Sequence, residues 1–409
     1  MDQASQQAAM QRPFEGLKVI DCASFIAAPA AATILGDFGA DVIKLEPPEG
    51  DPYRELFRAP GSVPTERNYL WELDGRNKRS LAIDLKHTEG IAVLHALVRS
   101  ADVFITNLPL PVRDRLGIDA ASLCPLNPRL VYASFTAYGE TGPEAAKTGF
   151  DSTAYWARSG LMDLIRADHT APPTRSVTGM GDHPSSVALY GAIVTALLQR
   201  ERTGRGGLVS SSLLANGLWS NGSLAQAALN GMRFPPRQPR EMAPNPLTNL
   251  YRCRDGRWLN LVMLNPARQF EPLCAALDCP QLASDPRFAQ PEARTANQRE
   301  LVQALDEAFA RHDLADWRSR LDAAGITFGV VGTIYDIPDD EQMRAAGAVV
   351  PFADGQGFTV SSPFQLADVC KVAPGPAPEL GAHSADILAE LGYDAAQIAQ
   401  LRQAGVLAG

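Results

Sequence analysis

An aspartate that follows a glycine-rich turn is the first residue in this sequence that could do chemistry. The segment Gly179-Met180-Gly181-Asp182 precedes a long apolar stretch at residues 185–202, which predicts a helix. Asp182 therefore has two interpretations. It could cap this helix through its side-chain oxygen. Alternatively, it is a carboxylate nucleophile whose flanking glycines let a substrate carbonyl approach, with nearby N–H groups to stabilise an oxyanion. The local sequence does not separate the two.

Other arrangements of residues that carry catalysis are incomplete in the sequence. His183 follows Asp182 directly, but neighbouring residues on a helix point in different directions, so the spacing does not make a catalytic dyad. The other histidines are scattered, and no Ser-His-Asp pattern or metal-binding Cys/His cluster occurs. The turn CASFIAAPA, which follows the first predicted strand, contains no glycine, and this argues against a dinucleotide site. Two basic groups beside predicted strand ends are either solvated or bind a phosphorylated ligand: Arg76, Lys78 and Arg79, and Arg113 with Arg115.

Composition and charge exclude several classes of protein. Of the 409 residues, 45% are hydrophobic and 20% are charged, which is typical of a globular protein and not of a disordered one. The net charge is −9, so the chain lacks the overall basic character of nucleic-acid-binding proteins. The six cysteines form no CxxC pair, and we expect them to be reduced in a cytoplasmic protein. The start, MDQASQQAAMQ, lacks the apolar core of a signal peptide, and the most apolar stretch, residues 187–198, is too short to span a membrane.

Strands and helices alternate in the first third of the chain. Apolar runs at residues 17–22 and 41–46 predict buried strands on either side of a helix at 27–38. The pattern recurs, with strands predicted at 81–85, 102–106 and 129–135 and a helix at 89–100. This alternation indicates an open, parallel sheet covered by helices.

A proline-dense stretch at residues 232–246 marks a predicted domain boundary. The segments after it predict a small α+β region, with strands at 259–263 and 325–332 and helices at 266–277, 297–311 and 314–324. Two short helices are expected near the C-terminus, where Ser384 and Asp394 are good N-cap residues. We therefore expect a large α/β domain formed by residues 1–220 and 335–409, and a small α+β domain at residues 225–330.

Six stretches of the chain resemble class III CoA-transferases, in the order in which that family carries them. The family includes formyl-CoA:oxalate and carnitine CoA-transferases and the related α-methylacyl-CoA racemases. The resembling stretches are FEGLKVIDCASFIAAPAAATILGDFGADVIKLEPPEGDPYR (14–54), GRNKRSLAIDLK (75–86), ADVFITNLPLPVRDRLGID (101–119), NPRLVYASFTAYGETGP (127–143), RTGRGGLVSSSLLAN (202–216) and ELGAHSADILAELGYDAAQIAQLRQAGVL (379–407). Together they span nearly the whole chain.

The resemblance gives the glycine-aspartate turn a role. Asp182 matches the family's catalytic aspartate, which attacks the thioester carbonyl of a donor acyl-CoA. An acyl-aspartyl anhydride forms, the CoA thiolate returns to make an aspartyl-CoA thioester, and an acceptor carboxylate then takes the CoA. A carboxylate is ionised at pH 7, and we expect the positive end of the following helix to keep Asp182 in that form.

The resemblance also implies contacts with CoA, which would be a substrate, with no cofactor tightly bound and no metal. The residues that match CoA-contacting positions are Ile83 near the adenine, Asn107 and Leu108 beside the CoA, Arg115 near its phosphates, and Lys147 near a family lysine that also contacts CoA. The chain departs from the family in two places. Ile26 stands where the family has a glutamine near the reacting thioester, and MAPNPLTN at 242–249 replaces a glycine-rich lid found in some formyl-CoA transferases.

Two further departures favour transfer over racemisation. Racemases of the superfamily carry a histidine in a GHD motif, and here the motif is Gly149-Phe150-Asp151. Phenylalanine cannot move a proton. Arg252 stands in the place of a racemase glutamate. Three alternatives stay open: an intramolecular CoA shift like that of mesaconyl-CoA isomerases, which SFIAAP and FITNLP also resemble; a racemase; and a non-catalytic acyl-CoA-binding protein, against which the intact Asp182 argues.

The resemblance finally implies a Rossmann-like large domain and an interlocked homodimer. It does not identify the acceptor acid. Three arginines near the predicted site suggest a small polar or dicarboxylic acid as acceptor, with succinyl-CoA as a natural donor: Arg158, Arg166 and Arg175. The expected partners are therefore an acyl-CoA and a small carboxylic acid, without nucleic acid or membrane.

Overall fold

The computed structural model describes residues 12–409 and divides them into two compact units. The first unit consists of the described residues up to Met162, together with Arg175–Asn230 and Gln342–Gly409. The second unit consists of Asp163–Thr174 and Gly231–Glu341. Residues 163–174 thus group with the second unit, whereas the sequence places them in the large domain. The N-terminal stretch in which we saw no signal peptide, residues 1–11, lies outside the described residues.

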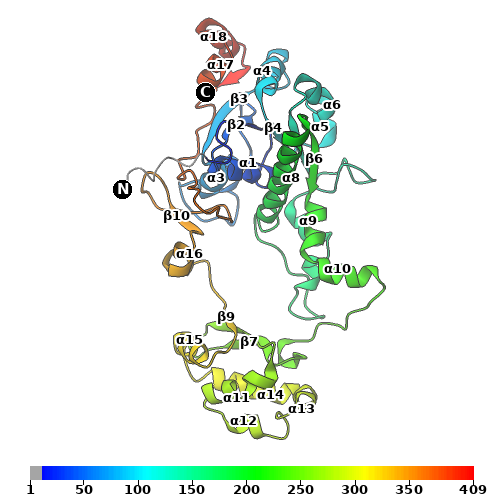
Figure 1. The fold of residues 1–409 in the computed structure, drawn as a ribbon, viewed down its shortest axis with the longest axis vertical. Helices are drawn as coiled ribbons and strands as arrows, with labels where there is room; N and C mark the ends of the chain where they lie inside the picture. The colour runs from blue at the N-terminus through cyan, green and yellow to red at the C-terminus, as the bar shows by residue number, and fades with distance from the viewer. Residues whose placement is uncertain (1–11) are drawn as a thin grey trace. The chain divides into compact units, whose positions relative to one another are not determined.

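A seven-stranded sheet forms the centre of the first unit (Figure 1). Its strand order is β12-β3-β2-β1-β4-β5-β6; β12 is antiparallel to β3, and all other pairs are parallel. In register, Lys18 of β1 lies beside Asp41 of β2, and Val19 of β1 lies beside Val103 of β4. The strands are β1 (Lys18–Asp21), β2 (Asp41–Glu46), β3 (Lys78–Ile83), β4 (Val103–Thr106), β5 (Val131–Thr136), β6 (Gly207–Ser212) and β12 (Leu407–Ala408). The predicted parallel α/β sheet is confirmed.

Helices cover both faces of this sheet because its strands are apolar on both sides. Successive residues of a strand point to opposite faces, so Val19 and Ile20 belong to two separate buried clusters. The cluster of Val19 includes residues of α1 (Ala27–Asp37) and α8 (Asp182–Thr203). The cluster of Ile20 includes residues of α4 (Thr88–Ser100), α17 (Ser384–Glu390) and α18 (Ala395–Gln403).

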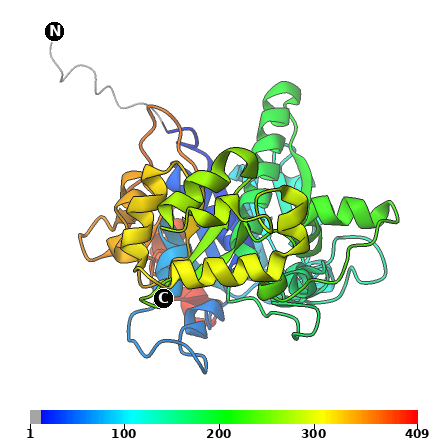
Figure 2. The ribbon, with the colours of Figure 1, turned by 90° about the horizontal axis from the view of Figure 1, so that it is seen from below.

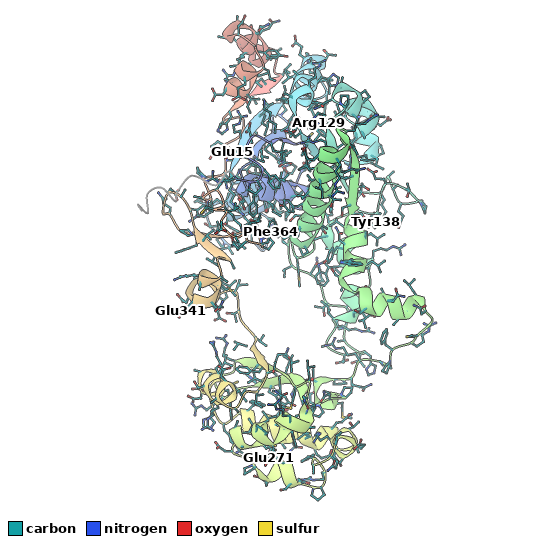
Figure 3. The ribbon with its side chains drawn as sticks, in the orientation of Figure 1. Glu15, Arg129, Tyr138, Glu271, Glu341 and Phe364 are labelled. Carbon is teal, nitrogen blue, oxygen red and sulfur yellow. The ribbon has the colours of Figure 1, made fainter. Side chains whose placement is uncertain are left out.

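Shorter elements complete the first unit. They are α2 (Tyr53–Leu56), α3 (Tyr69–Gly75), α5 (Leu110–Leu116), α6 (Ala120–Leu123), η2 (Cys124–Leu126), the π-helix η3 (Asp151–Ala157), α9 (Leu213–Ser220), α10 (Gly222–Leu229) and the hairpin β10 (Val349–Pro351) and β11 (Phe358–Val360). Two helices lie where the units meet along the chain: α7 (Leu161–Leu164) and α16 (Glu341–Ala345). The segment after β11 packs on the end of α1, where Phe364, labelled in Figure 3, stacks on Phe38 with ring centroids 5.0 Å apart.

The two C-terminal helices differ in how they begin. The Asp394 side chain accepts a hydrogen bond from the Gln397 N–H at 2.8 Å and caps α18, as expected. The expectation that Ser384 caps α17 was wrong, because the N-cap is His383. Ser384 Oγ instead donates to the Ala408 carbonyl at 3.0 Å and thereby holds β12 at the edge of the sheet.

The second unit is a small antiparallel sheet packed against helices, drawn in yellow-green to yellow in Figure 2. Its core gathers large side chains from both, including Tyr251, Leu261, Leu305 and Trp317. Its elements are η4 (Arg240–Met242), β7 (Thr248–Arg252), β8 (Trp258–Val262), α11 (Pro266–Ala276), α12 (Gln281–Ser284), α13 (Pro291–Ala296), α14 (Gln298–Phe309), α15 (Leu314–Ala323), β9 (Phe328–Val330) and η5 (Ile337–Asp339). Across residues 12–409, no helix has both the length and the apolar character that crossing a membrane requires.

Candidate active site

A crevice lies at the carboxyl ends of β1 and β4, where the strand order of the large sheet reverses. From β1 the chain proceeds to β2 and β3 on one side, while β4, β5 and β6 lie on the other. Loops that leave two such strands diverge, and open α/β sheets bind ligands between them. Here Asn107 fastens the two loops together: its Oδ1 accepts from the Ser24 N–H at 2.8 Å, and its Nδ2 donates to the Ser24 carbonyl at 2.7 Å.

Two cavities meet at this clamp. The larger, of about 440 Å³, is lined by Asp182 and Asn107, and the smaller, of about 230 Å³, is lined by Ile83 at the end of β3. Ser24 and Leu108 line both, so the cavities lie on either side of these two residues. The other residues of the larger cavity are Phe25, Ile26, Ala27, Pro109, Phe135, Thr136, Ala137, Thr148, Gly149, Phe150 and Leu213. An elongated ligand, and not a compact one, suits a path of this form.

Asp182 is the first residue of α8, but it does not cap the helix. The N-cap residue is Gly181, and the start of α8 has no side-chain capping bond. Within the described residues, no side chain or backbone group donates a hydrogen bond to the Asp182 carboxylate or forms an ion pair with it. The capping interpretation is therefore wrong. The carboxylate lines the larger cavity without a partner.

The glycines of the turn are needed for its shape and packing. Gly179 has φ of +76°, a conformation that L side chains rarely adopt. A Cβ on Gly181 would lie 2.8 Å from Cγ of Tyr155 and 3.0 Å from Cβ of Asp151. The Gly181 N–H donates to Asp151 Oδ2 at 3.1 Å, so the π-helix η3 holds the turn directly. The structure thus gives these glycines a packing role, where the sequence suggested room for a substrate.

Burial and neighbouring negative charges control the ionisation of Asp182. Burial, followed by the charge of Asp151, raises its pKa to about 7; His183 lowers the pKa and Asp74 raises it further. The expectation that the start of the helix keeps this group ionised at pH 7 is met only in part, because burial and the charge of Asp151 raise its pKa. Near neutral pH, both forms of Asp182 are populated.

His183 contacts a residue far away in the sequence. Its Nε2 lies 3.1 Å from Oδ1 of Asp74, and its Nδ1 lies 3.2 Å from the Gly179 carbonyl oxygen. The other oxygen of Asp74 accepts from the Tyr53 hydroxyl at 2.6 Å. Burial works to lower the pKa of His183, but the hydrogen bond and charge of Asp74 and the charge of Asp182 raise it overall. His183 therefore forms no dyad with its neighbour Asp182; its partner is Asp74, 109 residues away.

The wall of the larger cavity contains a strained aromatic residue. Phe25 has φ of +63°, which is a genuine outlier for a bulky side chain. Its N–H donates to Asp51 Oδ1 at 3.3 Å, and its ring meets Phe150 edge-on with centroids 5.8 Å apart. Asp51 in turn pairs with the buried Lys44 at 2.8 Å. Such strain persists only where the surroundings over-determine the conformation, as they do at this turn.

Comparison with known proteins decides the family. Residues 14–384 match the model of CoA-transferase family III. The chain belongs to this family. It is 32% identical to (R)-2-hydroxy-4-methylpentanoate CoA-transferase of Clostridioides difficile, over 96% of this chain and 99% of that protein. It is 30% identical to succinyl-CoA:glutarate CoA-transferase of Mus musculus, over 97% of this chain and 90% of that protein.

A solved structure supports the same assignment. A CAIB/BAIF family protein from Brucella suis superposes with a TM-score of 0.83 at 31% identity, covering 93% of this chain and 100% of that one. The chain is therefore an enzyme, a class III CoA-transferase that acts on CoA thioesters and carboxylic acids.

The structure sorts the residues expected to contact CoA. Ile83, Asn107 and Leu108 line the two cavities. Arg115 and Lys147 are exposed and line neither of them. The Lys147 Nζ lies 3.0 Å from a carboxylate oxygen of Glu144 and 5.1 Å from the ring centroid of Tyr138, labelled in Figure 3.

Most of the other basic residues singled out in the sequence form internal ion pairs. Arg76 pairs with Asp37 at 2.7 Å, Lys78 with Asp21 at 2.9 Å, and Arg79 with Asp41 at 2.6 Å. Arg113 is buried and donates to Ser134 Oγ at 2.6 Å. Arg76, Lys78 and Arg113 are buried and are therefore not solvated, whereas Arg79 is partly exposed and pairs with carboxylates near the surface.

Sequence reasoning missed one basic residue at the site. Lys86 is exposed and lines the smaller cavity, together with Ile83. It follows the end of β3, at the edge of the sheet where α/β proteins bind ligands. That position was the signal that could have identified it.

Proposed function

We propose that this CoA-transferase moves CoA from an acyl-CoA donor to a small carboxylic acid through an aspartyl-CoA thioester on Asp182. One observation carries the proposal: an unpartnered carboxylate lines one of two cavities that meet at Ser24 and Leu108. In this proposal the CoA moiety binds in the smaller cavity, which is lined by Ile83, Lys86 and Leu108. In this proposal the acyl thioester occupies the larger cavity, beside Asp182.

The proposed chemistry needs only the ionised form of Asp182. An Asp182 oxygen attacks the donor's thioester carbonyl, the C–S bond breaks, and an acyl-aspartyl anhydride forms. The CoA thiolate then attacks the Asp182 carbonyl carbon and releases the donor acid as a carboxylate. The acceptor carboxylate attacks the carbonyl of the aspartyl-CoA thioester, the C–S bond breaks and releases the CoA thiolate, and a second anhydride forms. Thiolate attack on its acyl carbon forms the new acyl-CoA and regenerates Asp182.

The lining of the larger cavity argues against a two-base racemase. Of the described residues that line it, Asp182 alone is ionisable. Phe150, which stands in the place of a racemase histidine, contributes an aromatic wall there. Racemisation requires one group to remove a proton and a second to return it. Transfer through Asp182 requires no group that removes a proton from the substrate and none that returns one.

The same lining bears on the acceptor acid. None of the three arginines that suggested a dicarboxylic acid lines this cavity: Arg158 lies 3.5 Å from Glu144, Arg166 belongs to the second unit, and Arg175 lies outside the lining. Apolar side chains such as Ile26 and Leu213 dominate it instead. We therefore favour an acid with a single carboxylate and a small apolar substituent, as in the name of the Clostridioides difficile relative. A dicarboxylic acceptor with succinyl-CoA as donor remains the second candidate, favoured by the mouse relative's name.

Trapping tests the covalent step and the acceptor class together. The protein is mixed with succinyl-CoA or a 2-hydroxyacyl-CoA and then with hydroxylamine, which converts an aspartyl thioester to a hydroxamate. We expect the hydroxamate on the peptide that contains Asp182, and no hydroxamate in the Asp182→Asn variant. CoA transfer to 2-hydroxy-4-methylpentanoate and to glutarate is then compared. Steady CoA transfer by the Asp182→Asn variant, or a hydroxamate on a peptide that lacks Asp182, would contradict the proposal.

Two further properties belong to this proposal. We propose that the enzyme works between two separate acids, so isotope-labelled free acceptor must appear in the acyl-CoA product; an intramolecular shift would leave the product unlabelled.

We also propose a cytoplasmic homodimer. The six free cysteines support the cytoplasm as the compartment, because thiols are kept reduced there. Elution as a stable species near 43.9 kDa, the mass of one chain, would contradict the dimer.

A further inference from the structure

The imidazole of His183 is held at both of its nitrogens. Nε2 lies 3.1 Å from Asp74 Oδ1, and Nδ1 lies 3.2 Å from the Gly179 carbonyl oxygen. Both neighbours are acceptors, because a carboxylate and a carbonyl oxygen have no proton to donate. A neutral imidazole carries one N–H, so one contact would set two lone pairs against each other. The imidazolium ion carries two and satisfies both contacts.

Other groups around His183 agree with a positive charge. Asp74 is buried, and its second oxygen is occupied by the Tyr53 hydroxyl at 2.6 Å. Asp182 adds negative charge from the start of α8. Among the described residues that line a cavity beside His183, Arg76 is the one permanent cation, and its charge is matched by Asp37 at 2.7 Å. The His183 side chain is 43% exposed, so partial hydration also favours its charged form.

His183 connects this charge to the turn that carries the nucleophile. Its backbone directly follows Asp182, and its ring lies against Gly179, the positive-φ residue of the same turn. The ring thus holds the turn at one end, while Asp151 holds it through the Gly181 N–H. His183 does not line the cavity that contains Asp182, so it acts on the reaction only through Asp182.

We propose that His183 is a positioning residue for Asp182: as an imidazolium anchored on Asp74, it fixes the turn and favours the ionised carboxylate. The inference rests on the proposed role of Asp182 as nucleophile. When Asp182 is converted to an anhydride or a thioester it loses its charge, but Asp74 still holds the imidazolium. The turn therefore keeps its shape through each covalent intermediate.

A pH profile separates this role from a purely structural one. His183→Gln keeps one donor and removes the charge that lowers the pKa of Asp182. In this variant we expect the acidic limb of kcat to move to higher pH, while KM for the acyl-CoA stays close to that of the wild type. At pH values below the pKa of Asp182, a shift of the limb by about one pH unit lowers kcat about tenfold, because the ionised fraction of Asp182 falls tenfold for each unit. Loss that is equal at all pH values, or a change confined to KM, would overturn the proposal. The control is His95→Gln in α4, which should leave the profile unchanged.

A second measurement does not depend on transfer or on a variant that folds. The histidine ring signals of the full-length wild-type protein are titrated by NMR, and the His183 signal is assigned by its absence from His183→Gln, or from proximity to Tyr53 if that variant does not fold. We expect a charged ring with its midpoint above the ordinary value for histidine. A ring that becomes neutral at or below about pH 6.5, the unperturbed value, would overturn the inference. If the ring is charged but no CoA moves, the proposed function has failed and this inference about the charge has not.

Discussion

Replacing Asp182 by asparagine should stabilise the protein while it abolishes transfer. In the folded protein, burial and Asp151 raise the Asp182 pKa from 3.8 to about 7. An acid with a raised pKa binds its proton more tightly in the folded state than in the unfolded state. The contribution of this group to the free energy of unfolding therefore falls as the pH rises from about 4 to about 7. Asparagine does not titrate and avoids this loss.

The size of the effect follows from the shift. A difference of about three pKa units corresponds to a ceiling of about 4 kcal/mol above pH 7, at 1.36 kcal/mol per unit. Asp182 is partly exposed to the cavity, so solvent screening reduces this. We expect Asp182→Asn to be about 1–3 kcal/mol more stable than the wild type at pH 8, with the difference shrinking toward zero near pH 4.

Urea unfolding at pH 5 and at pH 8 measures this difference, and a CoA-transfer assay is run on the same samples. The matched control is Asp394→Ala, because Asp394 is a true N-cap in this chain. That control should lose about 0.5–2 kcal/mol. The reasoning is refuted if Asp182→Asn is less stable than the wild type at pH 8, or if its advantage does not grow from pH 5 to pH 8.

Three further predictions concern the same site. The wild-type kcat should rise as the pH increases through about 7, because the ionised form of Asp182 is required and its pKa lies there; a flat rate from pH 6 to pH 8 would contradict this. Lys86→Ala should raise KM for the acyl-CoA severalfold with little change in kcat, whereas Lys147→Ala, outside both cavities, should leave both constants unchanged in steady-state assays. Gly181→Ala should lower the Tm, because its Cβ would meet Tyr155 at 2.8 Å, at a cost of about 1–3 kcal/mol; Gly191→Ala, inside α8 with open space around it, should match or exceed the wild-type Tm.

The sequence by itself determined many of the strands and helices and their order along the chain. Strands β1, β2 and β4 and helices α1, α4 and α8 fall where hydrophobic runs, prolines and glycines predicted them, because these patterns depend on residues a few positions apart. The ordered stretches shared with class III CoA-transferases also led to the family and to Asp182. The predicted domain boundaries and the roles of the site residues stay predictions.

Tertiary structure alone decided the partners of charged residues. From the sequence, Arg76, Lys78 and Arg113 are either solvated or part of a phosphate site, yet the fold buries them against acceptors from other strands and loops. His183 meets Asp74 across 109 residues, a separation over which no local pattern carries information. Which charge finds which partner depends on strand order and loop path.

Tertiary structure also decided the ionisation of Asp182. From the sequence, a carboxylate at the start of a helix is expected to be ionised at pH 7. In the fold, its pKa is close to 7 because the chain surrounds it with apolar atoms and places Asp151 nearby. The energy of a charge depends on the solvent and charges within a few ångströms, and these are set by packing between distant segments. That packing exists only once β1, η3 and α8 have come together.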